Sequence, residues 1–519
     1  ALFNPTALRW SQWSWYVRDQ WQFNPKLTVN AGVRWEYYPF GYSDNGKGLR
    51  LLDLNSGNVL IGGYGSVPVN DHMDVGHGQF LPRLGLAYRL TSSTVIRGGY
   101  GMSADPYTWH VLRNAYPAVL LDTNIQVTGS AADYVPAASL TGLNATGLGA
   151  ASYSVPTGIT LAPLPDLSSG VIPLPRNIST TTFANKFRRG YIHSFNLMVE
   201  QDWKKVVFQT GYVGSRAIRP VVNLNANASP PGTGSAGGIL SQRFGQNYTG
   251  TINELIPFKN NYYDSLQTQV TRRFSGGSTA GFSWTWGKSI DYADNEDLGF
   301  ITFPYPAYWQ KNRAPAGFDR KHNFKIYGVL RSPFGEGQHW SPGRVRNWLL
   351  GGWQLSPIIS YYTGLPFTVN ANGNLNANGS AQTADLVGNF HIINGKPLRT
   401  DPTGKTNCFQ STTSCHYFDP SAFAAPLITS NANAHYGNTN RNEFRGPGYF
   451  EMDLSLAREF KLTERFGLQV RADAFSLTNT PHFANPNTTC PGSATTGALC
   501  NTGANSTFGA ITSTLQPGG

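Results

Sequence analysis

The stretch Leu27–Tyr37 reads LTVNAGVRWEY and alternates between two kinds of side chain along its whole length. Its apolar positions and its polar positions follow each other strictly: Leu27, Val29, Ala31, Val33, Trp35 and Tyr37 against Thr28, Asn30, Gly32, Arg34 and Glu36. A period of two belongs to a β-strand, whose successive side chains point to opposite faces. The stretch therefore predicts a strand with one apolar and one polar face.

The same alternation recurs along the chain, for example over 279–287, 450–456 and 466–474. About twelve such strands are expected, each near or beyond the roughly 9–11 residues that cross a bilayer at a tilt. They begin near Trp13, Leu27, Phe80, Thr94, Tyr191, Val206, Tyr262, Thr279, His322, Trp353, Phe450 and Arg465. Aromatic side chains near the strand ends suit the two interfaces of a membrane: Trp15, Trp21, Tyr37, Trp203, Trp286, Trp353 and Tyr361.

The connections between these strands alternate between short turns and long loops. Short turns are expected at 24–26, 91–93, 204–205, 275–277 and 463–464, with a connection of middle length over 335–347. Long loops rich in Gly, Asn, Ser and Pro cover about 41–79, 106–190, 218–261, 291–318, 368–447 and 484–519. Short turns on one side and long loops on the other are typical of an outer-membrane barrel. We therefore interpret 1–519 as one partial outer-membrane β-barrel with long extracellular loops, and as all-β.

Composition agrees with a membrane barrel. Only 13% of the residues are charged, 13% are aromatic, and the chain contains 57 Gly and 33 Pro. No run of about 18 apolar residues exists, which excludes a transmembrane helix, and the first residues do not resemble a signal peptide. The net charge of +11 comes from scattered Lys and Arg without a basic stripe, so we predict no nucleic-acid partner. These side chains are expected to line a pore or to meet anionic lipid headgroups.

The four cysteines form two local pairs inside polar loops, Cys408 with Cys415 and Cys490 with Cys500. Neither pair has the CxxC spacing of a zinc site. Two disulfides in an oxidising compartment are the better interpretation.

No catalytic motif is present: the chain has no GxSxG elbow, no HExxH and no Walker loop. We therefore predict that it is not an enzyme and has no cofactor. Four loop carboxylates are weak candidates for a hard cation, although an acidic solvated loop is the simpler explanation: Asp291, Asp294, Glu296 and Asp297. A second loop group is a weaker transition-metal candidate: Asp71, His72, Asp74 and His77.

Several segments, in order along the chain, resemble the Oar-like TonB-dependent receptors. They are FLPRLGLAYRL and TVIRGGYGMSADP within 80–106, YDSLQTQVTRRFSGG from Tyr263, FSWTWGKSID from Phe282, FDRKHNF from Phe318, GGWQLSPIISYYTGLPFTV from Gly351, FRGPGYFEMDLSLAREF from Phe444, LQVRADAFSLTNTPHFANPN from Leu468 and FGAITST from Phe508. Each segment is weak alone, and the ordered set is more specific. The family carries a carboxypeptidase-regulatory-like domain ahead of a plug and a barrel.

The resemblance implies a bacterial outer-membrane transporter whose barrel has 22 strands and a plugged lumen. The chain would supply strands ten to twenty-one, so the regulatory-like domain, the TonB box, the plug and the closing strand are expected outside it. Folded alone, such a piece is expected to form a curved open sheet or a smaller closed one. Implied partners are outer-membrane lipid, the TonB energising complex acting through the missing plug, an unidentified substrate and a possible surface lipoprotein. For substrate capture, loop residues Tyr107, Trp109 and His110 are the candidates.

Two other functions stay open at this point. A passive outer-membrane pore or a surface adhesin would use the same barrel without TonB coupling. A secreted carbohydrate-binding β-protein is favoured weakly by the aromatic side chains and by loop sequons such as Asn144-Ala145-Thr146.

Overall fold

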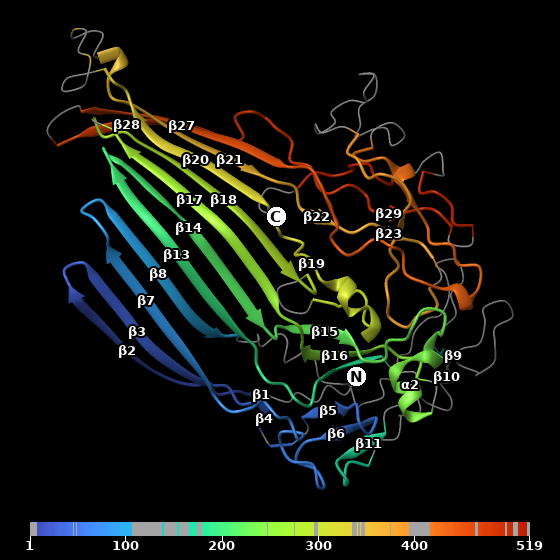
Figure 1. The fold of residues 1–519 in the computed structure, drawn as a ribbon. Coiled ribbons are helices and arrows are strands. Elements are labelled where there is room, and N and C mark those ends of the chain that lie inside the picture. The colour runs from blue at the N-terminus through green and yellow to red at the C-terminus, as the bar shows by residue number, and fades with distance from the viewer. Residues whose placement is uncertain are drawn as a thin grey trace.

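The computed structural model contains one large antiparallel sheet in which twelve long strands follow one another in chain order (Figure 1). These strands are β2 (Trp13–Asn24), β3 (Leu27–Tyr37), β7 (Gln79–Arg89), β8 (Thr94–Ala104), β13 (Tyr191–Trp203), β14 (Val206–Ile218), β17 (Asn261–Arg273), β18 (Thr279–Asp291), β20 (His322–Arg331), β21 (Trp353–Tyr362), β27 (Tyr449–Lys461) and β28 (Gly467–Ala474). Every expected strand is therefore confirmed, and each begins within two residues of its predicted start.

The structure describes residues 8–44, 46–47, 49–105, 138–139, 153–154, 166–173, 179–245, 248–274, 276–294, 299–334, 340, 343, 348–373, 375–393, 416–461, 465–493, 496–501 and 507–515.

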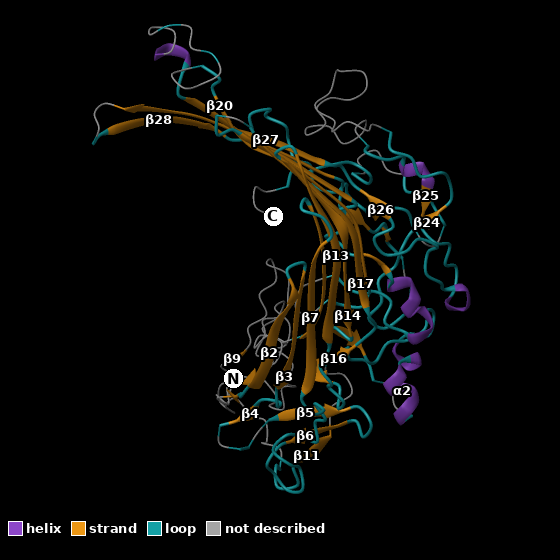
Figure 2. Cartoon of the chain, turned by 60° about the vertical axis from the view of Figure 1, so that its left-hand side comes forward, coloured by secondary structure: helices purple, strands orange, loops and turns teal. Residues whose placement is uncertain are grey.

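The sheet is a curved, open arc (Figures 1 and 2). Strands β2 and β28 stand at the two ends of the hydrogen-bonded order, and the described residues contain no pairing between them. Of the two expected outcomes for this chain, the curved open sheet is the one observed. An exposed sheet edge offers unpaired N–H and C=O groups to a further strand, so the arc is suited to extension at both ends.

The two faces of the sheet differ in the way that the alternation predicts. On the convex face, large apolar side chains stand exposed across the strands, among them Trp15, Trp21, Leu84, Leu197, Leu266, Trp286, Ile326 and Leu468. Cross-strand rows of rings run over this face, with Trp284 stacked on Phe324 at 5.9 Å between ring centroids and Phe324 at 6.0 Å from Tyr361. Such cross-strand aromatic pairs stabilise a sheet. A face of exposed apolar rings is matched to lipid.

The short turns are tight two-to-five-residue connections at one end of the sheet, the short-turn end. Between β13 and β14 only Lys204 and Lys205 connect the strands, and both have positive φ, 47° and 70°. Two left-handed residues make a type I′ hairpin turn, whose twist matches that of paired strands. Lys adopts positive φ less readily than Gly or Asn. The hydrogen-bonded pairing of β13 with β14 therefore keeps both lysines in this conformation.

The long loops gather at the opposite end, the long-loop end, where they build a folded cap (Figure 1). Two three-stranded sheets belong to this cap: β11 (Val171–Pro173), β6 (Asn58–Ile61) and β5 (Arg50–Asp53); and β12 (Thr180–Phe183), β16 (Ile252–Pro257) and β15 (Val221–Asn225). The remaining short strands are β1 (Leu8–Arg9), β4 (Tyr42–Ser43), β9 (Ala138–Ser139), β10 (Tyr153–Ser154), β19 (Ala314–Pro315), β22 (Pro366–Phe367), β23 (Asn370–Ala371), β24 (Asp385–Leu386), β25 (Phe423–Ala424), β26 (Phe444–Arg445) and β29 (Thr489–Cys490). The helical elements are η1 (Ser235–Gly237), α2 (Ile239–Phe244), η2 (Pro306–Asn312), η3 (Pro420–Ala422) and η4 (Asn431–Asn433). Within the described ranges, no helix is long and apolar enough to cross a membrane.

The hydrophobic core of the described chain lies in this cap and not in the sheet. The largest buried cluster packs side chains from several loops: Phe367, Val369, Tyr417, Phe418, Phe423, Phe444, Phe483 and Phe508, together with Cys490 and Cys500. A second cluster packs Phe40, Leu51, Met73, Phe183, Phe187 and Leu255. Segments predicted only as polar loops therefore carry their own apolar cores, because their scattered aromatic residues converge in three dimensions.

A charge placed on the convex face tests which face meets lipid. Leu266 lies near the middle of β17 and is 36% exposed on the convex face, while its neighbour Gln267 faces the other side. We expect Leu266→Arg to destabilise the lipid-embedded protein by about 2–4 kcal/mol, because the guanidinium would enter hydrocarbon. Urea unfolding in lipid vesicles measures the difference. Gln267→Arg is the matched control, and an equal loss for both variants would contradict the assignment of the faces.

Candidate functional site

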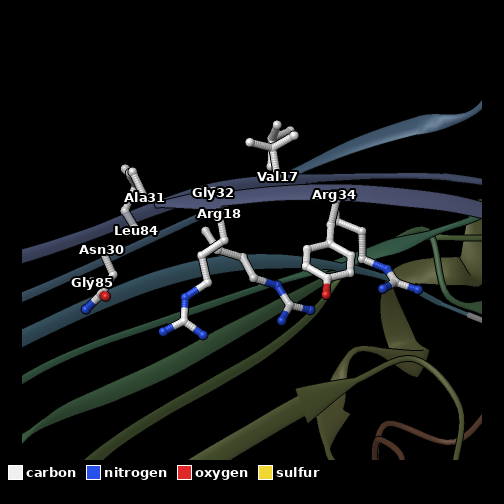
Figure 3. Close-up of a pocket in the computed structure, with 11 residues that line it drawn as sticks. Val17, Arg18, Asn30, Ala31, Gly32, Arg34, Leu84 and Gly85 are labelled. Atoms are coloured by element: carbon white, nitrogen blue, oxygen red, sulfur yellow. The ribbon is translucent and has the colours of Figure 1, made fainter. Parts of the chain in front are cut away.

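The concave face carries polar and charged side chains, and one hollow on it is lined by arginines. The hollow has a volume of about 460 Å³ and lies over strands β2, β3 and β7. Its lining includes Tyr16, Arg18, Asn30, Gly32, Arg34, Arg83 and Gly85. Figure 3 shows Arg18, Arg34 and Asn30 reaching to the inner side of the curved sheet, with Val17 on the opposite side. This arrangement presents several guanidinium groups to whatever fills the concavity.

These arginines differ in their partners. The guanidinium of Arg34 forms an ion pair with Glu36, donates to Ser14 at 3.2 Å, and shares Glu36 with the Tyr38 hydroxyl. Arg97, on the neighbouring strand β8, lies 3.5 Å from Glu200. Among the described residues, Arg18 and Arg83 make no ion pair. Two exposed guanidinium groups therefore lack an acidic counterpart on this part of the wall.

The positive charge of the chain is concentrated in a second place, the short-turn end. There the strand ends and turns carry Lys26, Arg89, Lys204, Lys205, Arg272, Arg273, Arg331 and Arg465, and the acidic residues among the described ones are Asp202 and Glu459. Rings lie beside these cations, with the Arg272 guanidinium 4.6 Å from the Phe274 centroid. Basic side chains therefore lie both on the concave face and at the short-turn end of the sheet.

Ion pairs buried in the cap tie distant loops together. The Arg441 side chain is 5% exposed and pairs with Asp291, 6% exposed, at the end of β18. Its Nη1 also lies 2.6 Å from Asp294, and its Nε donates to the Asn312 carbonyl at 3.0 Å. One residue on, Asn442 donates to Asp294 at 2.6 Å. This network fixes the loop that follows β18 against the loop that precedes β27.

The same contacts involve two of the carboxylates predicted as a cation site. Asp291 and Asp294 both pair with Arg441, while Glu296 and Asp297 lie outside the described residues. The second candidate group does not converge either. Asp71 is buried at 1% exposure, and Asp74 pairs with Arg188 at 3.0 Å. Within the described part of the chain, no group of three or more His, Cys, Asp or Glu could hold a metal ion.

Of the predicted disulfides, the structure contains Cys490–Cys500, with 4.9 Å between the Cα atoms. Both cysteines are fully buried in the largest cap cluster, so the bond closes a loop inside a packed core. Cys408 and Cys415 lie outside the described residues, and so do the substrate-contact candidates Tyr107, Trp109 and His110.

The arginine-lined hollow was not among the sites expected from the sequence. A signal was nevertheless present, because Arg18, Arg34 and Arg83 all occupy the polar positions of alternating strands. Their approach to one another depends on which strands pair and in which register, and a single-strand pattern does not contain that information.

Of the carboxyl groups buried in the cap, Asp71 and Glu254 have the most strongly raised pKa values. Burial raises the pKa of Asp71 to about 8, although the backbone of Gly62 lowers it. In β16, burial raises the pKa of Glu254 to about 7, and the charge of Arg243 opposes this change. A carboxyl removed from water favours its neutral form, so both groups change charge near neutral pH.

Comparison with known proteins gives one family and a set of similar structures. The family described as "Outer membrane beta barrel domain" matches residues 2–518. No curated protein matches the sequence. Among solved structures, the chain is similar to the unliganded ferric citrate transporter FecA, with 10% identity, 91% of this chain and 41% of that chain covered, and a TM-score of 0.38.

Two further similar structures are an outer-membrane transporter and a ferric enterobactin receptor. The transporter YddB from Escherichia coli has 8% identity and a TM-score of 0.42. The match covers 91% of this chain and 50% of the YddB chain. A mutant of the ferric enterobactin receptor PfeA from Pseudomonas aeruginosa has 9% identity and a TM-score of 0.41. The match covers 91% of this chain and 40% of that chain. The chain thus spans between 40% and 50% of the length of these three solved structures.

Removing the guanidinium of Arg441 tests the cap network. We expect Arg441→Gln to destabilise the cap locally by about 3–5 kcal/mol, because the Asp291 carboxylate would stay buried without its cation. Hydrogen exchange of residues 306–315 measures the loss of protection. The matched control is Arg188→Gln, which breaks the exposed pair with Asp74 and should leave protection unchanged. Equal effects of both substitutions would show that the buried pair does not anchor the cap.

The raised pKa of Asp71 predicts a cap that loosens as pH rises. The folded state keeps the proton up to about pH 8, whereas the unfolded chain releases it near the ordinary value of 3.8. The free energy of unfolding should therefore decrease as the pH rises from about 4 to about 8, by at most about 1.4 kcal/mol per pH unit.

Hydrogen-exchange protection factors of residues 49–73, corrected for the intrinsic rate at each pH, measure this slope. Asp71→Asn cannot titrate and should make the profile flatter. If the protection of the wild type stays constant or increases with pH, the inference that the buried Asp71 carboxyl is neutral would be wrong.

Proposed function

Since the chain belongs to the outer membrane beta barrel domain family, we propose that it forms the wall of a TonB-dependent transporter in the bacterial outer membrane. In this proposal the long-loop end faces the cell exterior and the short-turn end faces the periplasm. A solute is captured at the cap and passes along the polar concave face. Residues outside this chain supply the plug and the contact with the TonB energising complex.

The observation that carries this proposal is the open arc. Twelve long strands lie in one hydrogen-bonded path, yet β2 and β28 do not pair in the described structure. A sheet that stands in hydrocarbon must close, because an unpaired backbone group there costs several kcal/mol. If twelve strands do not close, the complete wall is wider, and barrels of 22 strands are the plugged transporters. The open arc favours the wall of a wide transporter barrel and argues against a small barrel that closes by itself.

The polar concave face supports the same proposal. A narrow barrel fills its interior with side chains, whereas here the concave side chains include exposed arginines and a hollow of about 460 Å³. Such a surface suits a wide interior that holds water, a solute or a plug. Because no catalytic constellation accompanies it in the sequence, we propose transport and not an enzymatic reaction.

A passive pore or a surface adhesin is the second candidate. The packed cap favours it to some extent, since a rigid set of extracellular loops can bind a partner without any pumping. The two proposals differ in the interior of the complete protein, which is plugged in one case and open in the other.

Electrical conductance separates these two functions. The full-length natural protein, purified from its own outer membrane and placed in a planar lipid bilayer, should show no steady conductance if a plug fills the lumen. A stable, open conductance would support the passive pore. Sequencing the complete reading frame is the companion measurement. We expect it to encode a plug and a TonB box upstream of this chain. A complete frame without them would contradict energised transport.

A further inference from the structure

We propose that the arginines at the concave hollow form a binding site for a multivalent anion, a solute that carries two or more carboxylate or phosphate groups. The proposal deepens the proposed function and rests on it, since it names the charge class of the solute that passes along the wall. The site consists of Arg18 on β2, Arg34 on β3 and Arg83 on β7, with Gly32 between them.

Strand register places these groups on one face at a defined spacing. Arg18 lies directly opposite Gly32, and Gly32 lies directly opposite Arg83, so the three residues form a row across three strands. Adjacent strands lie about 4.8 Å apart, which puts the two arginine Cα atoms about 10 Å from each other. Arg34 is two residues from Gly32 on the same strand and faces the same side. Three guanidinium groups thus surround one side-chain-free position.

The floor of this site is made of glycine. In the register, Gly85 lies opposite both Asn30 and Gly99, and Gly101 lies opposite Arg83, all on the concave face. A Cβ added at Gly32 would come within 2.8 Å of the Val17 carbonyl oxygen, so close strand packing requires glycine there. At Gly32 the absence of a side chain leaves the backbone between Arg18 and Arg83 open to a ligand group.

Charge balance indicates that a ligand belongs here. The described acid beside this group, Glu36, is shared between Arg34 and the Tyr38 hydroxyl. Elsewhere on the concave face, Arg97 has Glu200 and Arg471 has Asp473 as carboxylate partners. Arg18 and Arg83 are exposed and make no ion pair within the described residues. An anion that binds between them would interact favourably with both guanidinium groups.

The chemistry of the guanidinium group selects the ligand class. Its planar fork binds carboxylate and phosphate oxygens in pairs, and it keeps its charge at any physiological pH. A monovalent ion can satisfy one fork, whereas the spacing between Arg18 and Arg83 favours a solute with several anionic groups. We therefore assign the site to carboxylate-rich or phosphate-rich solutes.

Calorimetric titration of the full-length protein in detergent tests this site. Citrate and pyrophosphate serve as multivalent probes, and chloride serves as the monovalent probe. We expect both multivalent probes to bind, chloride to bind far more weakly, and added salt to weaken the binding. The double substitution Arg18→Gln with Arg83→Gln should weaken binding by about tenfold or more, since two charge-assisted contacts are lost.

The matched control is Arg272→Gln with Arg273→Gln, which removes the same charge from exposed positions at the short-turn end of the sheet. This control should bind the probes like the wild type. A second variant, Arg18→Lys with Arg83→Lys, keeps the charge and should bind with intermediate affinity because it loses the planar forks. Folding of each variant is checked on detergent gels, where an unheated folded barrel and a heat-unfolded chain migrate differently.

Three outcomes overturn the site: no binding of either multivalent probe by the wild type, equal weakening in the control pair, or unchanged affinity in the Arg18 and Arg83 variant. The first outcome would mean that a carboxylate of the protein itself occupies the arginines. Because the titration needs no uptake, its failure is separate from the conductance result: an unplugged pore with this site, or a plugged transporter without it, would each be recognised.

Discussion

The obligation to pair every backbone N–H and C=O group inside a bilayer determines the rest of this structure. A strand that crosses hydrocarbon has no water to bond, so its groups must find partners on both neighbouring strands. The continuous order of paired strands from β2 to β28 gives every strand except the two edge strands a partner on both sides. It also fixes the strand lengths and the tight turns, including the positive φ angles of Lys204 and Lys205. Strands β2 and β28 each have one edge without a neighbouring long strand in the described structure.

A wall of this kind separates its two tasks by face. The convex side needs only apolar side chains, since lipid replaces the hydrophobic core that a water-soluble sheet would need. The concave side is therefore free to carry charge, and Arg18 and Arg83 stand there without an acid in the described structure. The apolar core appears instead in the cap, where water surrounds the loops and burial of rings such as Phe418 and Phe423 is favourable. The apolar core and the exposed arginines of the wall are thus located in different parts of the molecule.

Charge follows the same division. In the cap, Arg441 is buried and holds Asp291, an interaction whose loss leaves a carboxylate without compensation. On the wall, an exposed arginine without a partner costs little in water and remains available to a ligand. At the short-turn end, Arg272 and its neighbours meet the membrane interface beside aromatic rings. The net charge of +11 is therefore distributed over regions with different physical roles.

The sequence by itself determined the strands, because an alternating pattern such as that of Leu27–Tyr37 is a local property and each strand obeys it separately. It also determined the side of the short turns and the Cys490–Cys500 pair, which are close in the chain. Only the tertiary structure decided that the twelve strands stay open, that the polar loops pack Phe418 and Phe508 into a core, and that Arg441 reaches Asp291 across 150 residues. The arginine row also depended on it, since Arg18 and Arg83 become neighbours only through the register with Gly32. Pairing and burial are relations between distant segments, and no local pattern of side chains contains them.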